Sequence, residues 1–215
     1  MDTLLTNQFL THYALAKPNA SAPAKETNAK YFELSDDAFL IHFVVGDGVA
    51  PYKNNSVLQV KVINYETFHI GLPAAFTHGK QICDLLAYTK LVNNYFSLNE
   101  LTDTDPAYVI DFTNSTGPRK RKRNKAMDQL QNTLSLLMAV PDIKAFIDNF
   151  IVKKCCFFNK KATPPTVVPT ILTAITSFNR INTITEEGFE MSHPAIEALG
   201  FKLFEYSGGK AADIV

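Results

Sequence analysis

The most distinctive chemistry in the sequence is a run of positive charge at residues 119–125. The run reads Arg-Lys-Arg-Lys-Arg-Asn-Lys, so six of its seven residues are cationic. Cations at this density repel one another, and bound phosphate groups relieve that repulsion. The same charge pattern is typical of nucleic-acid-binding arms and of nuclear localisation signals. We therefore predict a non-enzymatic protein that contacts the phosphate backbone of a nucleic acid without sequence specificity.

Two pairs of lysines, on either side of residues 155–158, extend this positive charge along the chain. Phe157 and Phe158 lie between the pairs and could stack on bases, but Phe158 also continues an apolar stripe and so fits core packing better. A solvated basic loop and a pure targeting signal stay open as alternatives for the charged run. The predicted nucleic-acid-binding residues are Arg119, Lys120, Arg121, Lys122, Arg123, Lys125, Lys153, Lys154, Lys160 and Lys161.

Charge is unevenly divided along the chain. The 215 residues include 21 Lys and Arg and 21 Asp and Glu, a formal net charge of zero. Residues 119–161 nevertheless carry a net charge of +8 and the remainder carries −8. Contact with a polyanion should therefore be confined to that segment. The opposed regions also suit a second hypothesis, a structural or assembly protein, such as a viral one, that self-associates through complementary charges and an extended N-terminal arm at 17–29.

Candidate catalytic residues are few. His69, with Lys61 on the same predicted sheet face, is the best candidate for an enzyme site assembled from scattered residues, which is the third hypothesis. None of the five His residues stands at metal-ligand spacing and no Cys-x-x-Cys occurs, so we expect no metal site. The sequence has no Gly-x-Ser-x-Gly and no phosphate-binding glycine loop, and we expect no cofactor.

The cysteines and the N-terminal residues indicate the cellular compartment in which the protein is expected. Three cysteines, two of them adjacent, do not make a disulfide framework and favour a reducing environment. The first residues lack the positive charge and the apolar stretch of a secretory signal. The sequence contains no run of about 18 apolar residues, so we expect no membrane span. We expect an intracellular protein, nuclear if the host is eukaryotic, whose partners are nucleic acid, another protein or its own copies.

The elements that would position these residues begin with an antiparallel sheet. Residues 38–45 are apolar on both faces, which is typical of a central strand. Apolar residues then occupy even positions from Leu58 to Leu72, and a three-residue loop at 64–66 would fold them into a hairpin that places Lys61 across from His69. A single long bent strand would give the same pattern.

Helical spacing of apolar residues dominates the rest of the chain. It predicts helices at 77–96, 127–138, 141–151 and 168–178, with a short helix between Ser192 and Gly200 and short strands at 107–112 and 201–206.

Together these patterns predict an α+β fold. In it, an N-terminal antiparallel sheet packs on a helix and a mostly helical second half follows. The predicted divisions are an N-terminal segment with its arm at 1–29, a sheet-and-helix region at 30–112, and a mainly helical region at 113–215. The last two could also form one compact domain.

Overall fold

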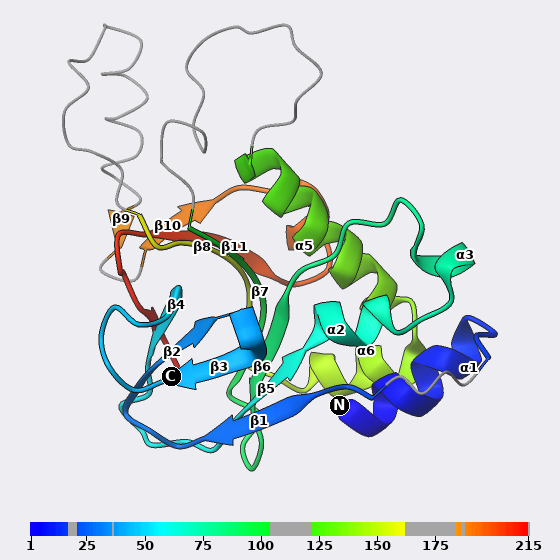
Figure 1. Ribbon diagram of the computed structural model, residues 1–215, viewed down its shortest axis with the longest axis horizontal. Coiled ribbons are helices and arrows are strands. Elements are labelled where there is room, and N and C mark those ends of the chain that lie inside the picture. Colours follow the sequence, from blue (N-terminus) through cyan, green and yellow to red (C-terminus); the bar gives the residue numbers. More distant parts are fainter. Residues whose placement is uncertain (17–20, 36, 104–121, 162–183, 186–187, 215) are drawn as a thin grey trace, which may run out of the picture.

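A large twisted sheet runs through the centre of the molecule (Figure 1). The computed structural model describes residues 1–16, 21–35, 37–103, 122–161, 184–185 and 188–214. Helices pack on one face of the eight-stranded sheet, and a four-stranded sheet packs on the other. The fold therefore mixes helices and strands, as predicted, in three layers.

The strands of the two sheets are listed here in spatial order. The large sheet runs β1 (Ala24–Thr27), β5 (Val60–Asn64), β6 (Leu85–Thr89), β7 (Tyr95–Thr102), β8 (Val152–Asn159), β11 (Lys202–Ser207), β10 (Gly188–Met191) and β9 (Ile184–Thr185). The small sheet runs β12 (Ala212–Asp213), β4 (Ala50–Lys53), β2 (Tyr31–Ser35) and β3 (Leu40–His42). Strand pairs β7–β8 and β8–β11 are parallel, and the other pairs of the large sheet are antiparallel.

The helices are mostly short. A π-helical segment (Leu4–Phe9) runs into α1 (Leu10–His12), and a 3-10 turn spans Asp37–Phe39; the others are α2 (Tyr65–Ile70), α3 (Ala74–Thr77), α5 (Lys122–Met138), α6 (Pro141–Asp148) and α8 (Pro194–Glu197). Both α5 and α6 lie in the connection between the parallel strands β7 and β8. Within the described ranges, no helix has the length and apolar character needed to cross a membrane.

Side-chain alternation along the central strands creates two hydrophobic cores. Successive residues of a strand point to opposite faces. On β8, Cys155 and Phe157 therefore enter the core under the helices, whereas Cys156 and Phe158 enter the core under the small sheet. All four are buried, so the prediction that Phe158 serves core packing is confirmed.

The helix predicted at 77–96 is wrong, because most of this region forms the antiparallel hairpin of β6 and β7. Every residue of β6 is buried, so the strand is apolar on both faces and its spacing also fits a helix. Thr89 closes the turn: its hydroxyl donates to the carbonyl of Val92 and accepts from the amides of Asn94 and Tyr95. No Gly or Pro marks this turn in the sequence.

The hairpin predicted at 64–66 is also wrong. Strand β5 ends at Asn64, whose side chain accepts a hydrogen bond from the amide of Thr67 at 2.7 Å and caps α2. An Asn at this position satisfies a free amide of the first helical turn. His69 consequently lies on α2 and not across a sheet from Lys61.

The central strand predicted at 38–45 is only partly formed. Leu40–His42 makes the short edge strand β3, and the next three residues are exposed in a loop. The buried carboxylate of Glu33 fixes this loop, because it accepts the amides of Gly46 at 2.8 Å and Gly48 at 2.6 Å. The apolar run thus marks a loop that the small sheet holds in place.

Strands in the second half contradict the expectation that it is mostly helical. α5 and α6 confirm the helices predicted at 127–138 and, in its first part, at 141–151. The second of these ends at Asp148, and β8 begins at Val152, so Phe150 and Ile151 lie in the connection between them. β8 is buried on both faces, so its residues also continued the helical spacing.

Other predictions for this half have mixed outcomes. The short helix before Gly200 and the strand at 201–206 are confirmed as α8 and β11, although His193 and not Ser192 precedes the first turn. The helix predicted at 168–178 and the strand at 107–112 lie outside the described residues.

The large sheet takes strands from all three predicted divisions of the chain. Residues 24–27, within the predicted arm, form its edge strand β1 and pair with β5. The region 30–112 supplies β5, β6 and β7, and the region 113–215 supplies the other four strands.

The first prediction concerns the β6–β7 turn. Thr89→Val keeps the branched shape of a strand residue but removes the hydroxyl that holds the turn. We expect the free energy of unfolding to fall by about 1–3 kcal/mol, because buried backbone amides lose their acceptor. Urea unfolding measures the change, with Thr3→Val at an exposed position as control. A loss equal to that of the control would contradict the role of Thr89.

Candidate anion-binding site

The basic residues at 119–125 have different environments. Arg119, Lys120 and Arg121 lie outside the described residues, and Lys122 is the first residue of α5. Arg123 forms an ion pair with Glu205 on β11, whose side chain is only 7% exposed. Its charge is thus compensated within the fold. Lys125 is exposed on the first turns of α5.

The four lysines around β8 are not gathered with α5. Lys154 is buried and lies over the rings of Phe204 and Tyr95, its Nζ 4.8 Å and 5.7 Å from the two ring centres. Lys153, on the opposite face of the strand, is 3.9 Å from a carboxylate oxygen of Asp148. Lys160 and Lys161 follow the other end of β8. Because they occupy both faces and both ends of one strand, these lysines do not form one basic surface.

His69 and Lys61, predicted to face each other, take part in separate interactions. Lys61 on β5 forms an ion pair with Asp2 and lies 3.8 Å from Glu26. His69 on α2 is 3% exposed and belongs to the helical layer. These interactions give no support to the prediction that Lys61 and His69 form a catalytic pair.

A cavity of about 370 Å³ opens beside His69. Its walls come from α2, from the connection between α3 and β6, and from the first turns of α5. The lining residues are Glu66, His69, Ile70, Thr77, Lys80, Gln81, Ile82, Lys125 and Gln129. We call this cavity the His69 pocket.

Side chains of α5 fix the connection that forms one wall of the His69 pocket. The amide groups of Gln129 and Asn132 donate to the carbonyls of Ile82, at 2.9 Å, and Gln81, at 3.3 Å. The hydroxyl of Thr133 accepts from the amide of Cys83 at 2.8 Å. Because these bonds come from one helix, the two walls are held at a fixed separation.

Buried His69 is the most unusual polar group of the pocket. Its Nε2 atom is buried and has no hydrogen-bond partner. Burial, with a smaller contribution from the positive charge of Lys80, lowers the pKa of His69 to about 4. The imidazole is therefore neutral near pH 7. A buried polar atom without a partner costs stability, and an ordered water, strain or a bound group can account for one.

Two exposed lysines approach the pocket from different elements. Lys125 belongs to α5, and Lys80 belongs to the connection after α3. The Nζ of Lys80 lies 3.2 Å from the centre of the Phe76 ring, so a cation–π contact orients it. Burial of its ammonium group lowers the pKa of Lys80.

A carboxyl group on β7 interacts with three residues that line the pocket, Glu66, Lys125 and Gln129. Burial is the main cause that raises the pKa of Glu100 on β7 well above its usual value, and the negative charges of Asp84 and Glu66 add to it. Lys125 and a hydrogen bond from Gln129 act in the opposite direction. These surroundings therefore favour the neutral form of the Glu100 carboxyl group over its charged form.

Metal and thiol chemistry receive no support from this geometry. Among the described residues, no group of three or more His, Cys, Asp or Glu side chains is placed to hold a metal ion. Cys83, Cys155 and Cys156 are buried as free thiols, and burial raises the pKa of each. Their thiolate forms are scarce near pH 7.

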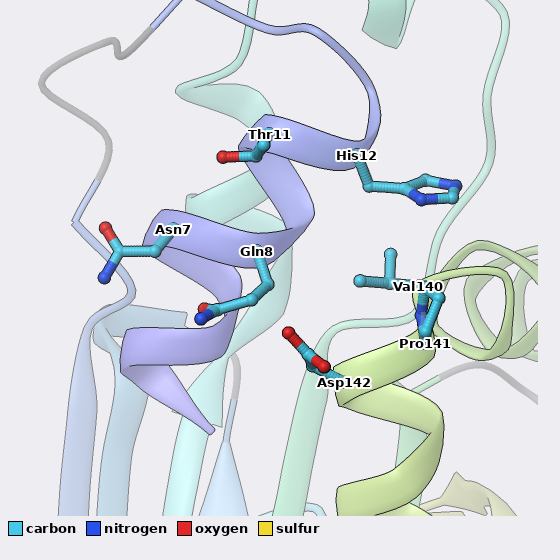
Figure 2. A pocket seen from close by; sticks show the side chains of 7 residues that line it. All are labelled: Asn7, Gln8, Thr11, His12, Val140, Pro141 and Asp142. Carbon is cyan, nitrogen blue, oxygen red and sulfur yellow. The ribbon is translucent and has the colours of Figure 1, made fainter.

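A second cavity, of about 380 Å³, lies between the N-terminal helix and α6 (Figure 2). In Figure 2 the side chain of Gln8 comes from the N-terminal helix and that of Asp142 from the start of α6. Among the described residues, those that line this cavity include no Lys or Arg; they are Asn7, Gln8, Thr11, His12, Val140, Pro141 and Asp142. It is therefore less suited to an anion than the His69 pocket.

Comparison with protein-family models, with curated proteins and with solved structures gives no match. The site is consequently defined by its geometry alone. Sequence reasoning singled out His69 and Lys125 but missed Lys80, Glu66 and Glu100. Lys80 fell within the helix wrongly predicted at 77–96, and no motif links Glu66 or Glu100 to His69.

The second prediction concerns pH. Unfolded His69 takes up a proton near its ordinary pKa of 6.5, whereas folded His69 does so only near 4. The folded state therefore loses stability as pH falls from about 6.5 to about 4, by up to roughly 3 kcal/mol. The variant His69→Gln does not titrate at this position, so its unfolding free energy should fall less over this range.

Urea unfolding at a series of pH values measures this difference. His78→Gln, at an exposed histidine, is the matched control and should follow the unmodified protein. Parallel curves for His69→Gln and the unmodified protein would contradict the neutral buried imidazole.

Proposed function

We propose that the protein contacts the phosphate backbone of a nucleic acid, without sequence specificity, at the start of α5. The observation that carries this proposal is the association of two exposed lysines, Lys80 and Lys125, with a partnerless buried imidazole beside that helix. Residues 119–121, all cationic, immediately precede α5 in the chain. The contact surface would then comprise these residues together with Lys122, Lys125 and Lys80.

Electrostatics favours an anion at this end of the helix. Lys122, Arg123 and Lys125 all lie within the first four residues described for α5, and closely spaced cations attract phosphate. No acidic residue lies in the first turn of α5 to offset its cations. Arg123 is paired with Glu205, so it stabilises the position of the helix and is not counted among the phosphate contacts.

The lysines around β8 are left out of the proposed surface. Lys154 is buried, and Lys153 and Lys161 approach the carboxylates of Asp148 and Asp103. Lys160 and Lys161 also lie at the far end of a strand whose other end carries Lys153. A smaller contact surface predicts a weaker dependence of affinity on salt than ten cations would give.

Self-association is a second candidate function, and exposed apolar side chains favour it. Leu91 is 85% exposed and Ile151 is 79% exposed. Their loops are adjacent, because the amide of Ile151 donates to the carbonyl of Asn93 at 3.0 Å. Apolar groups that share one edge of the molecule are typical of contact surfaces.

The third prediction tests phosphate contact. Mixed-sequence single- and double-stranded RNA and DNA are titrated with the protein over a salt series, and fluorescence anisotropy of the labelled strand is recorded. Replacing Arg119, Lys120 and Arg121 together by Gln should weaken binding at low salt at least about tenfold and reduce the salt slope by about 2–3, since each lost phosphate contact changes the slope by about 0.7–0.9.

The matched control is the double variant Lys153→Gln, Lys161→Gln, which removes two cations from positions away from α5 and should leave affinity nearly unchanged. The proposal would fail if none of the four nucleic acids binds at low salt. It would also fail if the control weakens binding as much as the triple variant.

The fourth prediction tests self-association. The exposed-patch variant Leu91→Asp, Ile151→Asp should sediment as a monomer at protein concentrations where the unmodified chain associates. Because the substituted side chains are exposed, the thermal unfolding temperature should change little. An unmodified chain that is monomeric at every concentration, in low and in high salt, would remove this candidate.

A further inference from the structure

We propose that the His69 pocket binds the phosphate monoester of a nucleotide, free or at the end of a strand, with Lys80 and Lys125 on the phosphate and Glu66 on the nucleoside. This inference rests on the proposed phosphate contact and assigns it a distinct site for a strand end. The basic segment before α5 would contact the backbone, and the pocket would receive the terminal group.

The size of the pocket suits one nucleotide unit. Its volume of about 370 Å³ falls near the lower end of the range for small-molecule sites, about 300–1,000 Å³. A continuous strand would have to pass through the pocket, whereas its base is closed by buried His69 and Ile82. A terminal unit can enter from the open side, where both lysines are exposed.

The charges match a monoester better than a diester. A terminal phosphate carries about −1.5 to −2 charges near pH 7 and three acceptor oxygens, whereas an internal diester carries one charge. Lys80 and Lys125 supply two positive charges from separate walls. His69 lines the same pocket, and a rotation of its neutral ring would bring Nε2, which is buried and lacks a partner, to a third oxygen.

The remaining lining accounts for the nucleoside part. Glu66 places a carboxylate, which accepts hydrogen bonds only, in a pocket that otherwise attracts anions. Sugar hydroxyl and base amino groups are donors that a nucleoside carries and inorganic phosphate lacks. Ile70, with 70% of its surface exposed, and Ile82 add apolar contact area for the ring systems.

A binding experiment distinguishes the two sources of the monoester. One single-stranded 12-mer is prepared with a 5′-phosphate, with a 3′-phosphate and with hydroxyl groups at both ends. Calorimetry measures the affinity of the protein for each of the three strands. It also measures the affinity for a nucleoside 5′-monophosphate, for the nucleoside and for inorganic phosphate. We expect the preferred phosphorylated strand to bind at least about tenfold more tightly than the strand without phosphate. The nucleoside monophosphate should bind more tightly than either of its parts.

Two variants test whether the preference for a phosphorylated strand arises in the pocket. Lys80→Gln and Lys125→Gln alter exposed side chains and should each reduce the preference for the phosphorylated end to about threefold or less. The strand without phosphate should lose only about twofold, because each variant removes one backbone contact and leaves those of residues 119–122. Lys210→Gln, at an exposed lysine near the C-terminus, is the matched control and should keep the full preference.

The titration of His69 gives a second measurement. A phosphate bound against the imidazole favours its protonated form, so nuclear magnetic resonance should show the His69 pKa rising when the monophosphate is added. Lys80→Gln should weaken this response.

Each outcome decides one of the two proposals. Preference for a phosphorylated strand supports a site for strand ends, and binding of the free monophosphate alone supports the pocket while removing the nucleic-acid function. Equal binding of all three strands, with no binding of the monophosphate, would overturn the pocket and leave backbone contact intact. Inorganic phosphate that binds as tightly as the nucleotide would overturn the nucleoside assignment.

Discussion

Burial of the central strands on both faces is the constraint on which the rest of the structure depends. All five residues of β6 are buried, and β7 and β8 are buried along most of their length. A sheet with two apolar faces needs a cover on each. The helices cover one face and the four-stranded sheet covers the other. Buried polar groups pair within this arrangement: Tyr52 of the small sheet donates to the side chain of Asn99 on β7.

The same constraint places the candidate site at the margin of the helical layer. α5 lies in the connection between two parallel strands, so its position is set by the sheet. Its first turn is tied to β11 through Arg123 and Glu205, and its middle holds the connection before β6 through Gln129 and Thr133. One helix therefore carries a structural ion pair, the wall of the pocket and one of the pocket's two lysines.

Elements with one apolar face and one exposed face were predicted correctly from the sequence. Elements that are buried on both faces were assigned the wrong secondary structure. α5 and α6 have one apolar face and one exposed face, and their spacing predicted them. β6 and residues 155–158 of β8 are apolar at successive positions, so their spacing fitted helices equally well. In β7, Ser97 and Asn99 alternate with Phe96 and Leu98, but its first two residues were included in the helix predicted at 77–96. The turn at Thr89 depends on a side-chain hydroxyl, and the end of β5 depends on a cap from Asn64. Neither position has the Gly or Pro that usually indicates such a change of direction.

The candidate site was predictable only in its charge. The excess of cations before α5 is visible in the sequence, but the compensation of Arg123 by Glu205 joins residues far apart in the chain. The pocket likewise combines α2, the connection before β6 and α5, so its members have no common spacing. Single residues such as His69 and Lys125 were identifiable, whereas their association depends on the packing of three elements.

The parallel pairing of β8 has a consequence for how the chain folds. Strand β8 pairs Val152 with Tyr95 on one side and Cys155 with Leu203 on the other, so neither neighbour is close in sequence. Closing such large loops costs chain entropy before any core contact compensates for it. The β5–β6–β7 meander can form from local contacts. Strand β8 can pair with β7 only after the connection that contains α5 and α6 has folded back across the sheet. We expect its apolar surface to be open to water and to other chains until then, so that the slow step of folding is also the one most exposed to aggregation.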